Sequence, residues 1–170
     1  MLSESARMNS AAEARFRIQA TSSYSPTVKV IALDTPSESV VSRLARGSWK
    51  HTTFLTAAVP SAAAPVDSEF RVLGWLSDLT GQPRNLTDEV DAADLVVMVA
   101  APGGRAYAAS IIGEACSLRR VTTAGLVVGG ISAPEAAVSK PLLQLRPWSL
   151  MVVVADADDY IDNMLTALRA

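Results

Sequence analysis

The chain has 170 residues, of which 49% are hydrophobic and 19% are charged; this suffices for one domain with a full core and excludes a disordered protein. The formal net charge of −2 provides no basic face, so nucleic acid is not an expected partner, although recognition through shape or aromatic side chains stays open. A single cysteine and the lack of an apolar run long enough to cross a bilayer predict a cytoplasmic protein that binds no membrane.

The N-terminal residues 1–25 contain three arginines among serines and alanines, a composition that loosely matches a transit peptide. Glu4 and Glu13 argue against that interpretation, and the segment lacks the apolar centre of a secretion signal. We expect a flexible or partly helical extension, followed by one domain over residues 26–170.

Short β-branched runs then alternate with segments of helical periodicity. Stretches such as Leu95–Val99 and Met151–Val154 are apolar at consecutive positions, which is typical of strands covered on both faces. The expected strands are Val28–Leu33, Thr52–Ala58, Phe70–Leu76, Leu95–Ala100, Thr122–Val128 and Leu150–Ala155. The expected helices are Ser37–Arg46, Arg105–Arg120, Pro134–Leu145 and Asp158–Arg169. This alternation predicts an α/β protein, a three-layer α-β-α sandwich around a mostly parallel, doubly wound (Rossmann-like) sheet of about six strands.

Two regions interrupt the alternation. Pro60–Pro65 is a proline and alanine segment that we expect to form a surface loop. Ser77–Asp91 contains Gly81, Pro83 and Asn85 and is expected to consist of turns, with at most one helical turn after Thr87.

The stretch Ala93–Ser110 carries the clearest functional signal, because an apolar strand stops at Pro102-Gly103-Gly104 and a helix follows. Such a turn can present backbone N–H groups and the positive end of a helix dipole to an anion at the carboxyl edge of the sheet. We therefore expect an anion or ligand site at Gly103, Gly104 and Arg105. The alternative is that the glycines only form the turn.

A second glycine pair, Gly129-Gly130, follows the next strand and is expected at the same edge, where it lines a ligand cleft or turns the chain. The segment Ser132–Glu135 has the composition of a helix N-cap, so we expect Ser132 to cap the following helix.

Asp34 and Asp156 stand at the ends of the first and last expected strands. If these ends converge, the two carboxylates form a metal site, with Mg²⁺ as the natural ion. The alternative is that both residues cap turns and helices.

Other polar or reactive residues are expected to be structural. His51 precedes the second strand and therefore lies at the amino edge, opposite the expected cleft. Cys116 lies within a helix beside small residues, which indicates packing rather than nucleophilic chemistry. Trp49, Trp75 and Trp148 are too scattered for a stacking platform, and at least one is expected to anchor an interface.

About half of the chain resembles the nucleotide-binding domain of tubulin and the bacterial division GTPase FtsZ. The resemblance is carried by Val28–Leu33, Ser37–Leu44 and Thr52–Ala57, and more closely by Ala93–Val99, Pro102–Ala115 and Val121–Val128. It implies a nucleotide as the bound group. The chain departs from the family at Asp34–Ser39, which contains no glycine where the family has a glycine-rich turn, and it keeps only Gly103 and Gly104 of the longer phosphate loop.

These features favour a small binding or accessory protein that holds an anionic ligand, such as a nucleotide, at the carboxyl edge without efficient turnover. Two alternatives stay open. One is a metal-assisted enzyme that acts on a phosphorylated or carboxylate substrate through Asp34, Asp156 and Arg105. The other is a protein-interaction or assembly module whose ligand site has decayed, and a homo-oligomer fits this alternative best.

Overall fold

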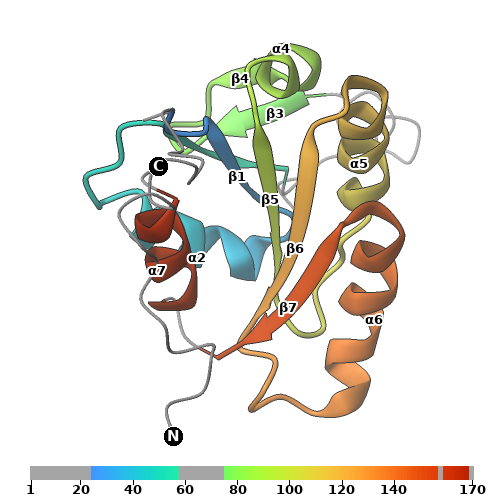
Figure 1. Cartoon of the computed structure of the whole chain (residues 1–170). Helices are drawn as coiled ribbons and strands as arrows, with labels where there is room; N and C mark the ends of the chain where they lie inside the picture. Colours follow the sequence, from blue (N-terminus) through green and yellow to red (C-terminus); the bar gives the residue numbers. More distant parts are fainter. Residues whose placement is uncertain (1–23, 58–74, 157–158, 169–170) are drawn as a thin grey trace, which may run out of the picture.

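The computed structural model describes residues 24–57, 75–156 and 159–168. Within them, one sheet has seven strands in the order β4-β3-β2-β1-β5-β6-β7 (Figure 1). β2, β1, β5, β6 and β7 run parallel, whereas β3 pairs antiparallel with β2, and β4 pairs antiparallel with β3. The strands are β1 (Val28–Ala32), β2 (Thr52–Thr56), β3 (Trp75–Asp78), β4 (Pro83–Asn85), β5 (Leu95–Ala100), β6 (Thr122–Val128) and β7 (Met151–Ala155).

Helices cover both faces of this sheet (Figure 1). They are α2 (Thr35–Leu44), α4 (Leu86–Asp91), α5 (Ala108–Arg119), α6 (Glu135–Leu145) and α7 (Asp159–Ala167), with a short 3-10 helix η3 (Arg146–Trp148). α2 and α7 lie on one face, and α5 and α6 on the other. The α/β class and the mostly parallel sheet are therefore confirmed.

Alternate residues of the central strands enter two separate cores. In β1, Val28, Val30 and Ala32 pack with α2 and α7, while Ile31 packs with α4, α5 and α6. Because both faces are covered, the central strands carry apolar residues on both faces, which explains their nearly continuous apolar runs.

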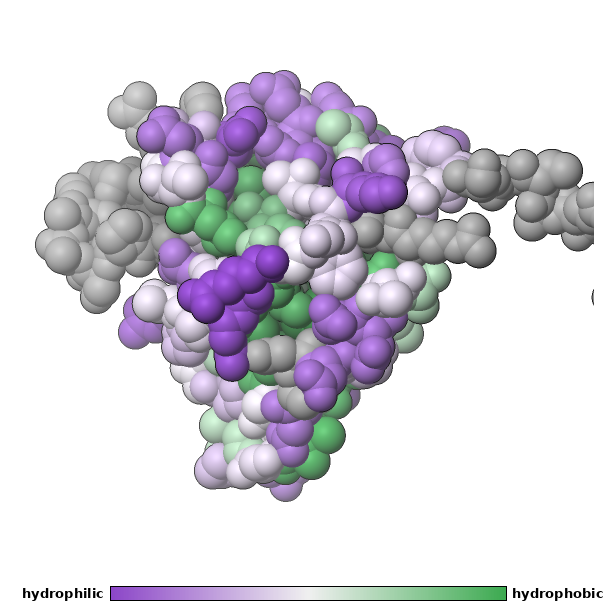
Figure 2. Space-filling model, turned by 90° about the vertical axis from the view of Figure 1, so that its left-hand side faces the viewer, coloured by the Kyte–Doolittle hydropathy of each residue, from purple (hydrophilic) through white to green (hydrophobic). Residues whose placement is uncertain are grey.

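The face covered by α2 and α7 is shown in Figure 2, where apolar surface is visible between polar residues. Trp49, Phe54 and Leu79 are partly buried at the margin of this core. Phe54 lies on β2, which is next to β3 and thus toward the β4 end of the sheet.

The first described strand, β1, lies in the middle of the sheet, and later strands are added on both sides of it. β2 is added on one side of β1, and β5, β6 and β7 follow on the other side. The connections that leave β1 and β5 therefore diverge, and in an open α/β sheet ligands bind outside the carboxyl ends of the strands at this point.

The region expected to contain only turns differs most from the sequence-based prediction. Residues 70–74 of the expected strand lie outside the described residues, and β3 begins at Trp75 and runs antiparallel to β2. Asp78 Oδ1 accepts hydrogen bonds from the N–H groups of Thr80 and Gln82, and Gly81 adopts a positive φ of 85°. This tight turn joins β3 to β4, and the short α4 follows.

Helix boundaries shift by at most three residues from the expected ones, and the end of α6 at Leu145 is as expected. α2 begins earlier because Asp34 caps it with a capping box that includes Ser37. α5 begins only at Ala108 because the preceding residues are held in other contacts; for example, the N–H of Ala106 donates to Gln144 Oε1 at 2.8 Å. The expected loop Pro60–Pro65 lies outside the described residues. No helix among the described residues has the length and apolarity that crossing a membrane requires.

Candidate functional site

The carboxyl ends of β1 and β5 meet through Asp34, which directly follows β1 and is 7% exposed. Its Oδ1 accepts the N–H of Ser37 at 2.8 Å, and its Oδ2 accepts the N–H of Ala101 at 2.9 Å. The carboxylate therefore caps α2 and also links the two strands at which the connections diverge. Both of its oxygens bind groups of the protein itself.

Gly103 and Gly104 form the turn after β5, and Gly103 has a positive φ of 73° that favours glycine. The N–H of Gly103 donates to the carbonyl of Ala137 at 2.8 Å, and the N–H of Gly104 donates to Ala101 at 3.0 Å. A Cβ at Gly104 would overlap Oδ2 of Asp34. Gly104 is thus required for the close approach of Asp34, and the N–H groups of both glycines are already bonded within the protein.

Two cationic side chains lie near the start of α5. Tyr107 precedes α5 without making a side-chain cap, so the first N–H groups of the helix receive no capping oxygen from it. Arg105 is exposed just before this point, and Lys140 Nζ of α6 lies 6.0 Å from the centre of the Tyr107 ring. Two cationic side chains therefore flank the positive end of the α5 dipole.

The second glycine pair is a structural connection after β6. Gly129 has a φ of 84°, and its N–H donates to the carbonyl of Ala155 at 2.6 Å. Gly130 is buried, and a Cβ there would overlap the side chain of Val154. These contacts hold the end of β6 against β7.

Asp156 follows β7 and binds the residue expected to cap α6. Its carboxylate accepts the hydroxyl of Ser132 at 2.7 Å and the N–H of Ser132 at 3.0 Å. The Ser132 hydrogen bond, with help from the backbone, lowers the pKa of the Asp156 carboxyl. The expectation that Ser132 caps α6 is therefore wrong: Pro134 is the N-cap residue, and no side chain caps the helix.

Asp34 and Asp156 have separate partners. β5 and β6 separate β1 from β7, and three strand spacings correspond to about 14 Å. Among residues 24–57, 75–156 and 159–168, no three histidine, cysteine or acidic side chains are grouped to hold a metal ion. The two-carboxylate metal site stays a prediction with no shared geometry to support it.

His51 and Cys116 lie where the sequence predicted. His51 is exposed before β2, and its carbonyl accepts the N–H of Val28 at the start of β1, which is the amino edge. Cys116 is fully buried in α5, and burial raises the pKa of its thiol to about 11. A thiol with such a pKa is a packing group rather than a nucleophile.

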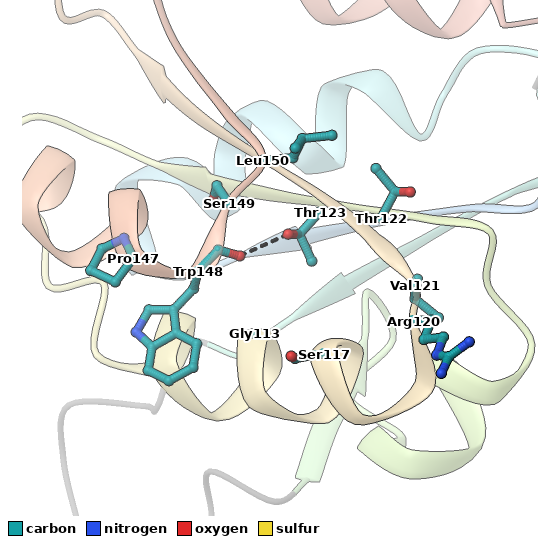
Figure 3. A pocket seen from close by; sticks show the side chains of 10 residues that line it. All are labelled: Gly113, Ser117, Arg120, Val121, Thr122, Thr123, Pro147, Trp148, Ser149 and Leu150. Atoms are coloured by element: carbon teal, nitrogen blue, oxygen red, sulfur yellow. Dashed lines mark hydrogen bonds between the residues drawn. The ribbon is translucent and has the colours of Figure 1, made fainter.

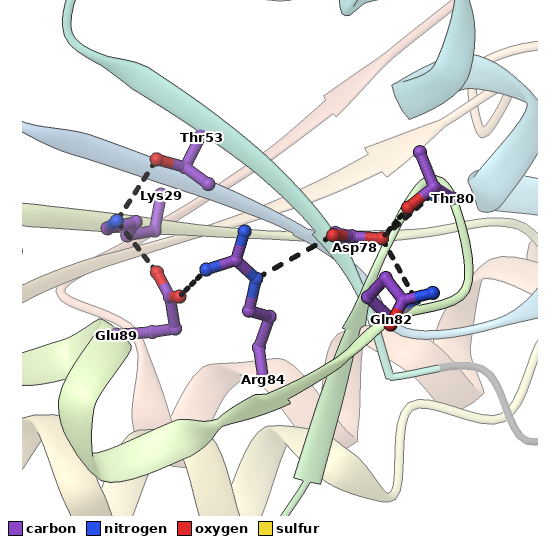
Figure 4. Close-up of polar contacts among 7 residues, drawn as sticks. All are labelled: Lys29, Thr53, Asp78, Thr80, Gln82, Arg84 and Glu89. Carbon is purple, nitrogen blue, oxygen red and sulfur yellow. Dashed lines mark hydrogen bonds and ion pairs between the residues drawn. The ribbon is translucent and has the colours of Figure 1, made fainter.

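A polar cluster under α4 was not predicted from the sequence. Lys29, buried on β1, donates to Glu89 Oε2 at 2.7 Å and to the hydroxyl of Thr53 at 3.0 Å (Figure 4). Arg84 Nη1 lies 3.9 Å from Glu89 Oε1, and Arg84 Nε lies 3.7 Å from Asp78 Oδ2. Arg84 thus links the Lys29–Glu89 pair to Asp78 in the β3–β4 turn. The signal in the sequence was a lysine within the otherwise apolar run Val28–Leu33.

A pocket among the described residues lies at the opposite edge from the predicted site (Figure 3). It has a volume of about 490 Å³ and is formed by the end of α5, the start of β6 and the segment before β7. Trp148 packs over Gly113, and its carbonyl accepts the hydroxyl of Thr123 at 2.7 Å. Arg120 is the one charged residue in its lining, so the pocket offers hydroxyl groups and a single cation.

Comparison with protein-family models found no match to this chain, and comparison with curated proteins found none either. The resemblance to the tubulin and FtsZ domain consequently stays an expectation that rests on the residue pattern.

Proposed function

We propose that this chain is a protein-interaction module on a doubly wound, Rossmann-like scaffold whose ligand crevice is closed by its own side chain. The order of the five parallel strands, β2-β1-β5-β6-β7, is one of the common doubly wound orders. In such sheets the crevice lies between the connections that leave β1 and β5.

The observation that carries this proposal is the position of Asp34 in that crevice. Its buried carboxylate binds the start of α2 and the N–H of Ala101, and it touches Gly104. A phosphate in the same place would meet a negative charge and would have to replace two internal hydrogen bonds. The N–H groups of Gly103 and Gly104 donate to Ala137 and Ala101, so their use by a ligand carries the same cost.

A second function is favoured by the start of α5. Arg105 and Lys140 flank a helix that begins without a side-chain cap, and this arrangement suits a small oxyanion on the surface rather than a nucleotide in the crevice. This second function keeps the anionic ligand expected from the sequence but places it at the start of α5 rather than beside Asp34.

The test combines a ligand screen with a measurement of association. Thermal unfolding of the purified protein is recorded with nucleotides, dinucleotides, phosphate and sugar phosphates, with and without Mg²⁺, while sedimentation velocity follows association over a wide range of protein concentration. The interaction module predicts concentration-dependent association and no selective thermal shift.

The opposite pattern would reject this proposal. A ligand at one hundred times its dissociation constant stabilises by about 2.7 kcal/mol, which is measurable. A shift caused by phosphate and lost in Arg105→Ala, together with a monomer at every concentration, would establish the surface oxyanion site in its place. The matched control is Arg46→Ala, which removes an exposed arginine beyond the end of α2.

A further inference from the structure

We propose that β7 pairs with β7 of a second copy of this chain, in antiparallel orientation about Val153, and that the two sheets thereby become continuous. This proposal rests on the proposed function and names the partner and the surface. β7 is the last strand of the sheet, and no described strand pairs with its outer side (Figure 1).

The two edges of the sheet differ in a way that indicates which one is used. β4 has three residues, all exposed, and includes Pro83, which lacks an N–H, and the charged Arg84. Such residues protect an edge against pairing. β7 has five residues, Met151–Ala155, with neither a charge nor a proline, and is the kind of edge to which another strand is readily added.

Within the described part of the chain, no backbone group pairs with the outer side of β7. The N–H of Leu150 donates to the carbonyl of Thr123 on β6 at 2.9 Å. Because backbone direction alternates along a strand, Met151 and Val153 turn their N–H and C=O groups away from β6. Val153 is central in β7, so in a two-fold antiparallel pair it lies opposite Val153 of the second copy and exchanges both hydrogen bonds with it.

The side chains along this edge are apolar and incompletely covered. Leu150 is 83% exposed and Met151 is 52% exposed, and the three valines that follow are partly buried. Pairing with a second β7 would remove part of this apolar surface from water, which favours association.

Charge selects the antiparallel orientation. Exposed Arg120, at the end of α5 before β6, and exposed Arg146, in η3, lie on the side of the amino end of β7, whereas exposed Asp156 and Asp159 follow its carboxyl end. An antiparallel pair brings the basic end of each copy to the acidic end of the other. A parallel pair would place like charges together, which costs free energy.

The experiment uses Met151→Pro in the full chain. Proline removes the outward N–H of Met151 but leaves the hydrogen bond from the N–H of Leu150 to Thr123, so we expect the fold to be retained. The thermal unfolding temperature and the circular dichroism spectrum of the variant check this. In this pair Met151 lies opposite Ala155 of the second copy, whose carbonyl already accepts the N–H of Gly129, so proline acts through its ring, which obstructs the approach of the second strand at both ends of the two-fold interface. The hydrogen bonds of the central Val153 pair then cannot form fully, and the loss of about one of them per copy predicts a dimer about thirtyfold weaker in sedimentation velocity. Leu118→Lys, on an α5 residue that is 77% exposed, is the control and leaves association unchanged.

Hydrogen exchange at the Val153 amide provides a second measurement that does not depend on the variant. The proposal predicts that this amide is protected in concentrated wild-type protein and exchanges rapidly on dilution or in Met151→Pro. Protection that persists in the monomer would overturn the proposal, because another part of the same chain would then cover the edge.

The remaining outcomes separate the two proposals. If wild-type protein associates and Met151→Pro associates equally well, edge pairing is overturned while the interaction module stands on another surface. If wild-type protein is monomeric at all concentrations and a ligand shifts its unfolding temperature selectively, both proposals are overturned.

Discussion

The carboxylate of Asp34 accepts the backbone N–H of Ala101 at 2.9 Å and so connects the end of β1 to the end of β5. The same carboxylate accepts the N–H of Ser37 and begins α2. One buried side chain thus holds together the three elements that surround the expected ligand crevice.

Asp34→Ala is expected to lower the free energy of unfolding by about 1–3 kcal/mol, because it removes a helix cap and leaves the N–H of Ala101 without its acceptor. Asp34→Asn keeps one acceptor oxygen and should be less destabilising. Urea denaturation of the two variants measures the difference. Equal stability of Asp34→Ala and the wild type would show that the carboxylate does not hold the crevice closed.

Gly104→Ala should destabilise by about 1–3 kcal/mol because its new methyl group overlaps Asp34 Oδ2. In the Asp34→Ala background the overlap with the carboxylate is absent and only the close contact of the new methyl group with the carbonyl oxygen of Ala101, at 2.9 Å, remains, so the second substitution should cost less. A double-mutant cycle by urea denaturation measures this coupling. Additive effects would contradict the close packing of the two residues.

Gly103→Ala is the control for this cycle. A Cβ at Gly103 meets nothing within 4 Å, so its cost comes from the positive φ alone, about 1–2 kcal/mol. That cost should be the same with and without Asp34.

Lys29→Met should destabilise by about 3–5 kcal/mol, because it leaves the largely buried Glu89 carboxylate, 12% exposed, without its nearest cation. The double substitution Lys29→Met with Glu89→Leu removes both charges and should recover most of this loss. Chemical denaturation of the single and double variants tests the pair. A double variant less stable than Lys29→Met would mean that the ion pair does not explain the loss.

Acid should weaken the connection between Asp156 and Ser132. Hydrogen bonds from Ser132 lower the pKa of the folded-state carboxyl below that of the unfolded chain. Its stabilising contribution is therefore present above the unfolded pKa of about 3.9 and is lost as the pH falls through the lower folded value. The unfolding temperature of Asp156→Asn, measured between pH 7 and 2.5, should decline less below about pH 4 than that of the wild type.

Ser132→Ala provides the matching control. It removes the partner hydroxyl and should likewise reduce the decline of the unfolding temperature below about pH 4. An identical acid profile in all three proteins would assign the acid sensitivity to other carboxylates, such as Asp78 and Asp94, whose pKa values are also lowered by hydrogen bonds.

Local sequence patterns were sufficient for most helices and strands. The continuous apolar runs in β5 and β7 predicted parallel strands, and Pro102-Gly103-Gly104 predicted the turn before α5, because these features depend on neighbouring residues. The β3–β4 hairpin was missed because its strands are only four and three residues long and its turn residues dominate the pattern.

The sequence by itself determined an α/β domain, the order of its elements along the chain and the glycines and aspartates that follow its strands. Only the tertiary structure decided which of these residues meet, because strand order depends on contacts between distant segments. Asp34 reaches Ala101, 67 residues away, and Lys29 reaches Glu89, 60 residues away. The same strand order separates Asp34 from Asp156 and places the apolar β7 at the edge of the described sheet.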